Sequence, residues 1–437
     1  MDHSKLRAKM KKFTLMLFIL TVVGLVGCPF ANQQIEDPEP SYNVKIAWES
    51  DLINNLSIVH VVYNDYVYFY ERPPGYNSIN IYALTKLDAG TGEFIWRSDE
   101  IFSNVVFSQP VVIDGYVYVF LEPNYICCFD DKTGLFTAIV KIDIDNQNLK
   151  FNENITSYCQ YIYIGLYNNN ATYFARFNPE NIAHNDSETM QVFYPEILWQ
   201  PKVRHVVSAK QVFCNDIVYT STFSPLAEYP VELIGIDINS GDIKFHKSFG
   251  GPEDAHLPFP EDGSSVMGNP IIVNGNVLYY LNWSINAWNI NTGEQLFRHT
   301  FDYSIPESKW YTATNSLQPL YYDGKIYYTT GESYTDMDSY RNTYCISAAT
   351  GKLVWGAIAK NSESLFTNPI IFNGKLYMSQ YSGFRVYDAD NGRLLGVDKS
   401  FAGASFGRNI LYNNYLICVR EDRKTAEGRL VAVDLSR

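Results

Sequence analysis

Two short stretches of the chain carry residue types that could do chemistry. Cys127 and Cys128 are adjacent thiols, which could pair with each other in an oxidising compartment. Residues 388–392 read Asp-Ala-Asp-Asn-Gly, with the carboxylates and the glycine of a calcium-binding loop. Both interpretations depend on the element that holds the residues. Neighbours on a β-strand point to opposite faces, so a strand would strain a Cys127–Cys128 bond.

Other catalytic signatures do not occur in the sequence. The seven histidines are scattered without His-Glu-x-x-His or His-x-His spacing, and there is no Gly-x-Ser-x-Gly or Walker sequence. No Cys-x-x-Cys-His occurs, so we expect no covalently attached haem. Asp143-Ile144-Asp145 lacks the glycine of a tight calcium loop, which favours solvated charge. The sequence therefore predicts no catalytic residue, no metal site and no cofactor.

The composition is that of a folded, acidic protein. The 437 residues include 34 basic and 47 acidic side chains, for a formal charge of -13, so the chain repels phosphate backbones and we expect no nucleic-acid partner. Hydrophobic residues make up 46% and charged residues 19%, which excludes disorder and supplies a large core.

The first 27 residues form a predicted signal peptide. Basic residues cluster at positions 5–12, and positions 13–26 are uncharged, a run of about 14 residues that is short for a membrane span of about 20. The ending Leu-Val-Gly-Cys resembles the lipobox of bacterial lipoproteins, in which the cysteine is acylated and becomes the new N-terminus. Cys28 is therefore the predicted lipid anchor. An ordinary secretory signal, and a start at Met10, are the alternatives.

Residues 28–43 are predicted to connect the anchor to the folded body as a flexible linker. They contain three prolines and no apolar periodicity. Pro29 stands where an aspartate commonly retains lipoproteins at the inner membrane, which favours the outer membrane. The acidic body has no attraction to anionic lipid, so we expect membrane contact through the lipid anchor only. The prediction is an exported lipoprotein on the periplasmic face of the outer membrane.

A turn motif recurs along the rest of the chain. Its best copy is Leu87-Asp88-Ala89-Gly90-Thr91-Gly92-Glu93-Phe94-Ile95-Trp96, and further copies begin at residues 129, 236, 288, 346 and 387, with degenerate copies at 177 and 433. Each clear copy has Asp, Asn or Ser four residues before a glycine, which suits a side chain that caps backbone donors and a glycine at positive φ. Residues 388–392 belong to one copy, which favours a structural turn over a calcium loop.

A hairpin of alternating aromatic and β-branched residues precedes each turn motif. The eight hairpins lie at 62–70, 111–120, 158–166, 213–220, 271–281, 320–329, 370–378 and 410–419. The repeat length of about 49 residues is that of a four-stranded propeller blade. The last copy ends at its third strand, and residues 44–48 are similar to a fourth strand. The sequence thus predicts an all-β, eight-bladed β-propeller of four-stranded antiparallel blades over residues 44–437, a single domain closed by its N-terminal strand.

The pattern Asp-x-x-Thr-Gly-x-x-x-Trp resembles the tryptophan-docking repeat of the pyrroloquinoline-quinone-like propellers, in which a fourth-strand tryptophan packs against a neighbouring blade. Ala138 and Gly396 have lost the aromatic side chain in two repeats. The resemblance implies structural docking roles for Trp48, Trp96, Trp199, Phe245, Phe297 and Trp355.

Two branches of this family imply different functions. One is the lipid-anchored scaffold subunit of the outer-membrane β-barrel assembly machinery, which has eight blades and no catalytic centre. The other is the quinoprotein dehydrogenases, which use the quinone with calcium and have adjacent cysteines in the active site. Here Cys128 occupies the repeat position of Gly235, Ala287, Cys345 and Ala432, which favours a packing role. We therefore expect a non-catalytic, protein-binding scaffold with partners in outer-membrane assembly. A quinoprotein dehydrogenase or ligand-binding propeller is the alternative.

Loop lengths suggest where partners bind. Long segments rich in tyrosine, proline and acidic residues join second to third strands and blade to blade, and therefore lie on one face of the ring. The candidate binding residues on this face are Tyr76, Tyr229, Phe259, Trp310, Tyr311, Tyr334 and Tyr340. The alternative is that these side chains only pack on one another. Residues 181–195 are interpreted as an enlarged third-to-fourth turn on the opposite face, and as a second candidate contact.

Overall fold

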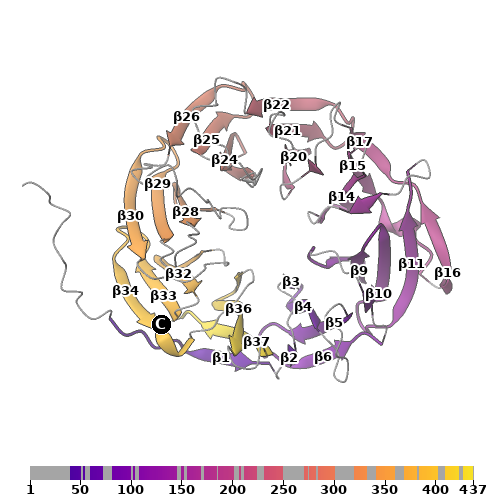
Figure 1. Cartoon of the computed structure of the whole chain (residues 1–437), viewed down its shortest axis with the longest axis horizontal. Helices are drawn as coiled ribbons and strands as arrows, with labels where there is room; N and C mark the ends of the chain where they lie inside the picture. The colour runs from indigo at the N-terminus through magenta and orange to yellow at the C-terminus, as the bar shows by residue number, and fades with distance from the viewer. Residues whose placement is uncertain are drawn as a thin grey trace, which may run out of the picture. The chain divides into compact units, whose positions relative to one another are not determined.

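Eight β-sheets follow one another around a ring in the computed structural model of the chain (Figure 1). All of the ring belongs to one unit, Tyr42–Arg437. The predicted all-β, eight-bladed propeller is confirmed. The structure describes residues 40–50, 53–54, 60–71, 81–99, 102–103, 108–144, 149–151, 155–168, 172–184, 186–200, 206–207, 211–223, 231–249, 270–273, 275–281, 284–300, 319–331, 341–359, 369–380, 383–401, 409–422 and 427–436.

The first half of the ring contains four blades, each numbered in chain order. Blade 1 contains β3 (His60–Tyr63), β4 (Tyr66–Glu71), β5 (Ile81–Asp88), β6 (Phe94–Arg97) and β7 (Phe102–Ser103). Blade 2 contains β8 (Val111–Ile113), β9 (Tyr116–Leu121), β10 (Tyr125–Asp130), β11 (Phe136–Ile142) and β16 (Asp186–Phe193). Blade 3 contains β12 (Lys150–Phe151), β13 (Thr156–Tyr158), β14 (Tyr161–Tyr167), β15 (Thr172–Phe177) and β17 (Glu196–Trp199). Blade 4 contains β18 (Val206–Val207), β19 (Val212–Cys214), β20 (Ile217–Phe223), β21 (Val231–Asp237) and β22 (Ile243–Phe249).

The second half completes the ring. Blade 5 contains β23 (Pro270–Val273), β24 (Val277–Leu281), β25 (Ser284–Asn289) and β26 (Gln295–Thr300). Blade 6 contains β27 (Leu320–Tyr322), β28 (Lys325–Gly331), β29 (Arg341–Ser347) and β30 (Leu353–Ala359). Blade 7 contains β31 (Ile370–Phe372), β32 (Lys375–Gln380), β33 (Gly383–Asp388) and β34 (Leu394–Asp398). Blade 8 contains β35 (Ile410–Tyr412), β36 (Tyr415–Asp422), β37 (Glu427–Asp434), β1 (Ile46–Glu49) and β2 (Ile53–Asn54).

The turn chemistry explains why the blades fold where they do. Asp88 Oδ1 accepts hydrogen bonds from the backbone N–H groups of Gly90 and Thr91, at 2.9 and 2.8 Å. This side chain therefore satisfies donors that the sheet leaves unpaired. Asp114 and Gly115 have φ values of 50° and 82° in the hairpin of blade 2. Type I′ hairpin turns need positive φ at both central positions, which favours the Asp-Gly dipeptide.

The ring closes between its two ends in sequence. β1 pairs antiparallel with β37, with Trp48 opposite Ala432. Asp434 N donates to Lys45 O at 2.8 Å, and Lys45 Nζ lies 2.6 Å from an Asp434 carboxylate oxygen. Figure 1 shows β1 and β37 side by side at the lower edge of the ring. The predicted closure by the N-terminal strand is confirmed.

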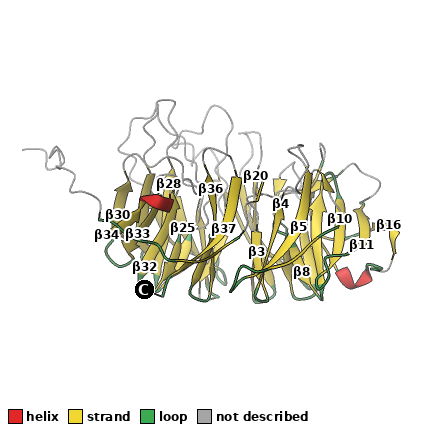
Figure 2. Cartoon of the chain, turned by 90° about the horizontal axis from the view of Figure 1, so that it is seen from below, coloured by secondary structure: helices red, strands yellow, loops and turns green. Residues whose placement is uncertain are grey.

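Residues 181–195 lie in the predicted enlarged third-to-fourth connection of blade 3, which joins β15 to β17. The connection begins with the short 3-10 helix η1 (Pro179–Asn181) and contains the whole of β16, which pairs in parallel with β11 of blade 2. The sequence did not predict this strand, which leaves its own blade and extends the sheet of the preceding one. Figure 2 shows β16 beside β11 at the side of the ring, with the short helix below them.

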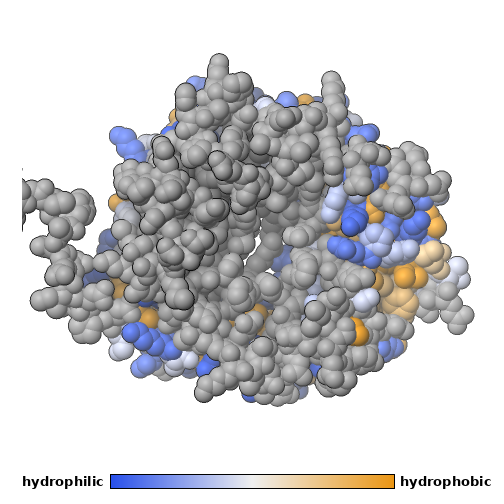
Figure 3. Space-filling view, viewed as in Figure 1, coloured by the Kyte–Doolittle hydropathy of each residue, from blue (hydrophilic) through white to orange (hydrophobic). Residues whose placement is uncertain are grey.

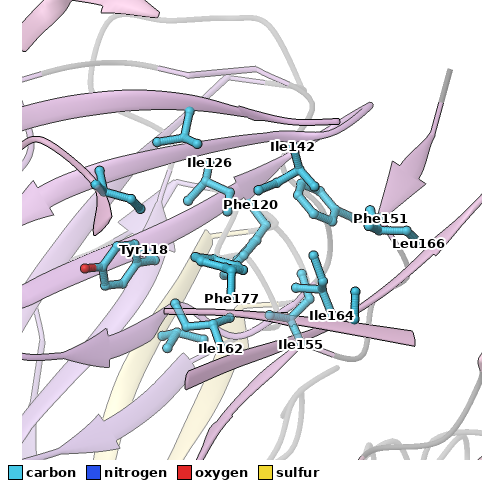
Figure 4. Packing of buried hydrophobic residues seen from close by; sticks show 14 of the residues in the cluster. Tyr118, Phe120, Ile126, Ile142, Phe151, Ile155, Ile162, Ile164, Leu166 and Phe177 are labelled. Carbon is cyan, nitrogen blue, oxygen red and sulfur yellow. The ribbon is translucent and has the colours of Figure 1, made fainter. Parts of the chain in front are cut away.

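Buried side chains lie between consecutive sheets. The largest cluster joins blades 2 and 3, where Tyr118, Phe120 and Ile126 face side chains such as Ile162 and Phe177 (Figure 4). Another 3-10 helix in the described part of the chain, η3 (Lys399–Phe401), follows β34. Within the described ranges, no helix is long and apolar enough to cross a membrane.

Candidate functional site

The most regular site in the ring is the joint between blades. The indole of Trp96, on the fourth strand of blade 1, lies against the turn of blade 2. A Cβ atom added to Gly134 would lie 2.6 Å from Trp96 Cε3, so glycine is needed there for steric reasons as well as for its φ of +73°. Trp96 Nε1 donates to Asp131 O at 2.9 Å. The same docking occurs at two further joints: Trp48 on Gly92 and Trp355 on Gly392.

The docking residue at the joint after blade 5 is a phenylalanine. Phe297 lies on Gly351, where an added Cβ atom would clash with its ring. Phenylalanine has no N–H, and the hydroxyl of Tyr279 on the second strand donates to Ala348 O at 2.7 Å, as that of Tyr327 does to Ala389 O at 3.1 Å beside Trp355. Burial raises the pKa of Tyr279 to about 12, so the hydroxyl keeps its proton. This role of the second-strand tyrosines was not predicted, although their alternation is visible in the sequence.

Two predicted docking residues deviate from the tryptophan pattern. Trp199 is half-buried, and Leu198 before it takes the buried position of β17. At this joint the Arg176 guanidinium donates to Ile238 O and pairs with Glu196 at 2.7 Å. The other residue, Phe245, is buried and packs edge-on against tyrosine and tryptophan rings at 6.1 and 6.5 Å.

The joint between blades 2 and 3 lacks the docking aromatic, because β11 has Ala138 at that position. The segment that leads into β16 contributes His184 instead. Its ring stacks on Tyr116 with centroids 3.5 Å apart, and its nitrogens lie 3.4 Å from Tyr118 Oη and 3.3 Å from Thr137 Oγ1. Burial lowers the pKa of His184, so the neutral ring is favoured. Blade 3 therefore holds blade 2 from outside through this segment.

A buried lysine reinforces the joint between blades 1 and 2. Lys86 occupies the third-strand position that holds Cys128, Gly235, Ala287, Cys345 and Ala432 in five other blades, and its side chain is 4% exposed. Its ammonium lies 2.9 Å from both the backbone oxygen and a carboxylate oxygen of Asp131. The Tyr66 ring lies 3.9 Å from Lys86 Nζ and adds a cation–π contact. The charge is thus paired inside the joint.

The adjacent cysteines belong to two different cores. Cys127 packs between blades 1 and 2, and Cys128 packs between blades 2 and 3, because successive residues of β10 point to opposite faces. Both are buried, and neither forms a disulfide. Burial raises the pKa of Cys128, which disfavours the reactive thiolate. The two thiols therefore pack in separate cores and do not face each other.

The turn at residues 388–392 already uses its carboxylates. Asp388 Oδ1 accepts from Asp390 N and Asn391 N at 2.9 and 3.2 Å, and Asp390 Oδ1 lies 2.6 Å from Lys325 Nζ of the preceding blade. Among the residues that the structure describes, no group of three His, Cys, Asp or Glu side chains could hold a metal ion.

The remaining predicted site residues lie outside the described residues. They are the lipidation residue Cys28 and the candidate binding face: Tyr76, Tyr229, Phe259, Trp310, Tyr311, Tyr334 and Tyr340.

The eight-bladed ring, with fourth-strand aromatics packed on turn glycines at four of the described joints, defines a propeller of the pyrroloquinoline-quinone-like class. A family model described as outer membrane protein assembly factor BamB matches residues 195–437, more than half of the chain. The chain belongs to this family. No curated protein matches the sequence.

Solved structures of both branches share the fold. BamB from Moraxella catarrhalis is 12% identical with a TM-score of 0.57, covering 91% of this chain and 99% of that chain. A europium-containing methanol dehydrogenase is 12% identical with a TM-score of 0.62, covering 90% and 93%. The quinohemoprotein alcohol dehydrogenase from Comamonas testosteroni is 11% identical with a TM-score of 0.62, covering 90% and 76%. These identities show the fold alone.

Proposed function

We propose that the protein is a non-catalytic scaffold, anchored by lipid at Cys28 to the periplasmic face of the outer membrane, that holds protein partners in outer-membrane protein assembly. The observation that carries the proposal is the family match over residues 195–437. The lipobox-like ending at Cys28 supports the anchor, and the acidic composition leaves the acyl chains as the means of attachment.

The packing of the chemistry-bearing residues supports a scaffold role. The adjacent thiols, which resemble a feature of quinoprotein active sites, are used in two inter-blade cores. The acidic turn at residues 388–392 is used in backbone capping and in an ion pair between blades. A rigid ring of this kind presents its loops and edges in fixed positions, as a binding protein requires.

The test is copurification from outer membranes. The full-length protein, expressed with an affinity tag at its C-terminus, should fractionate with the outer membrane and retain outer-membrane assembly subunits. The Cys28→Ser variant should lose the membrane fractionation while keeping the thermal stability of the wild type. Recovery of the wild type in the soluble periplasmic fraction, or without assembly subunits, would contradict the proposal.

A second measurement addresses the quinoprotein alternative. The purified protein is incubated with pyrroloquinoline quinone and calcium, and its absorbance is recorded before and after an alcohol is added. The scaffold proposal expects no bound chromophore after gel filtration. If the protein retains the quinone and the alcohol reduces it, the scaffold proposal is wrong and the protein is a quinoprotein enzyme.

A further inference from the structure

The outer side of blade 2 carries a strand that the other blades do not have among the described residues. β16 ends the sheet order β16-β11-β10-β9-β8, so it is the edge strand of that blade in the described part of the chain. It contains no lysine and no proline, the residues that most often protect exposed edges from pairing.

The backbone register shows which groups face outward. Asp143 N of blade 2 donates to Phe193 O at 2.9 Å, and Phe193 pairs with Ile142. Phe193 therefore directs its backbone groups toward β11. In a parallel pair the N–H and C=O of one residue point to the same side, and the next residue points to the other. The backbone N–H and C=O of Val192 thus face away from blade 2.

Three exposed side chains at and just after this strand are large and mainly apolar. Met190, Val192 and Tyr194 alternate along the chain and are 47%, 46% and 69% exposed. The space-filling view shows apolar residues gathered at the side of the ring where β11 and β16 lie (Figure 3). An edge with outward backbone groups and alternating apolar side chains has the features that bind an added strand.

The charge of residues 180–200 indicates which kind of partner strand would bind to β16. Residues 180–200 contain Glu180, Asp186, Glu188 and Glu196, and no lysine or arginine. Glu196 is paired with Arg176, which leaves three acidic residues without a basic one in the segment. A second copy of this chain, related by a two-fold axis, would bring two acidic segments together. A partner strand with basic ends would be attracted instead.

We propose that β16 is a docking edge for an extended segment of another protein, which adds as a further strand of blade 2, with alternating apolar side chains and flanking lysine or arginine residues. This inference rests on the proposed function for its choice of a protein partner.

The test uses a short fluorescent peptide in which valine and threonine alternate between two lysines at each end. Its fluorescence anisotropy is measured with the purified full-length protein. The lysine-ended peptide should bind, and a peptide with glutamate at both ends should bind at least about tenfold more weakly. Equal binding of the two peptides, or no binding of the first, overturns the proposal.

Two variants locate the peptide. Val192→Pro removes an N–H that faces away from β11, so blade 2 keeps its own hydrogen bonds while the added strand loses one. Val192→Lys repels the basic peptide and keeps the N–H. Each should weaken binding about tenfold. Val354→Lys is the matched control, because Val354 is a 45%-exposed valine on the outer strand of blade 6, and it should bind as the wild type does. Circular dichroism melting identifies any variant that fails to fold.

Each remaining outcome is decisive. Unchanged binding by folded Val192→Lys protein places the peptide elsewhere and refutes the edge. A wild-type dimer in sedimentation that Val192→Pro abolishes assigns the edge to a second copy and also refutes the proposal. The peptide assay contains neither membrane nor assembly subunits. If the peptide does not bind, the proposal of a docking edge is wrong, but the copurification result still tests the scaffold proposal. If copurification fails, the peptide result still tests the docking edge.

Discussion

Substitution of Gly134 by alanine measures how tightly the blades dock. Alanine at a φ of +73° costs about 1–2 kcal/mol for backbone reasons alone. The added Cβ atom would also lie 2.6 Å from Trp96 Cε3, and overpacking of this kind costs about 1–3 kcal/mol. We therefore expect Gly134→Ala to lower the free energy of unfolding by about 2–5 kcal/mol.

The control for this prediction is Gly374→Ala. Gly374 has a φ of +72°, but an added Cβ atom would meet nothing within 4 Å, so only the backbone cost applies. Urea unfolding followed by tryptophan fluorescence gives the midpoints and slopes of both variants. Gly134→Ala should lose about 1–3 kcal/mol more than Gly374→Ala. This excess should shrink in a Trp96→Leu background, where the indole is absent. Equal losses in the two variants would refute the inference that the indole presses on the turn.

Further predictions concern hydrogen bonding, pH and thiol reactivity. Trp48→Phe removes the Nε1 donor of a 3.0 Å hydrogen bond to Ala89 O, and should cost about 1–3 kcal/mol in urea unfolding. Burial lowers the pKa of His184, so the unfolded chain binds a proton more readily than the folded chain does. The contribution of His184 to stability is therefore complete above about pH 6.5, and it is lost as the pH falls below that value. His184→Gln should flatten this part of the pH profile of the urea midpoint, and an unchanged profile would contradict the role of the ring. In the native protein a thiol reagent should label exposed Cys159 quickly and buried Cys128 only after unfolding; rapid native labelling of Cys128, recorded by peptide mass spectrometry, would show that its core is open.

The propeller could be predicted because its signals are local and repeated. The Asp-to-Gly turn and the alternating hairpin recur at the spacing of a blade, and each copy predicts the same order of strands. Ring closure was predictable for a related reason, since Trp48 stands in a segment that matches the missing fourth strand.

The joints and the outer edge required the structure. The spacing of Trp199 suggested a docking residue, but the register of β17 places Leu198 in the buried position. Strand β16 was missed because it pairs in parallel with a strand of another blade, and no short-range turn signal records such a partner. The hydrogen bond from the Tyr279 hydroxyl to the next blade was missed for the same reason, because it joins residues 69 positions apart.

The pairing of β1 with β37 has a consequence for how the molecule is made. Strand β1 must wait, unpaired, until β37 has been synthesised, because Trp48 lies opposite Ala432. Contacts this distant in sequence slow folding, since the entropy of closing the whole chain is lost before the contact forms. The other seven blades can form as the chain is made, but the eighth sheet is completed only after β37 has been synthesised. Until then the chain is an open arc in which β1 lacks its partner strand.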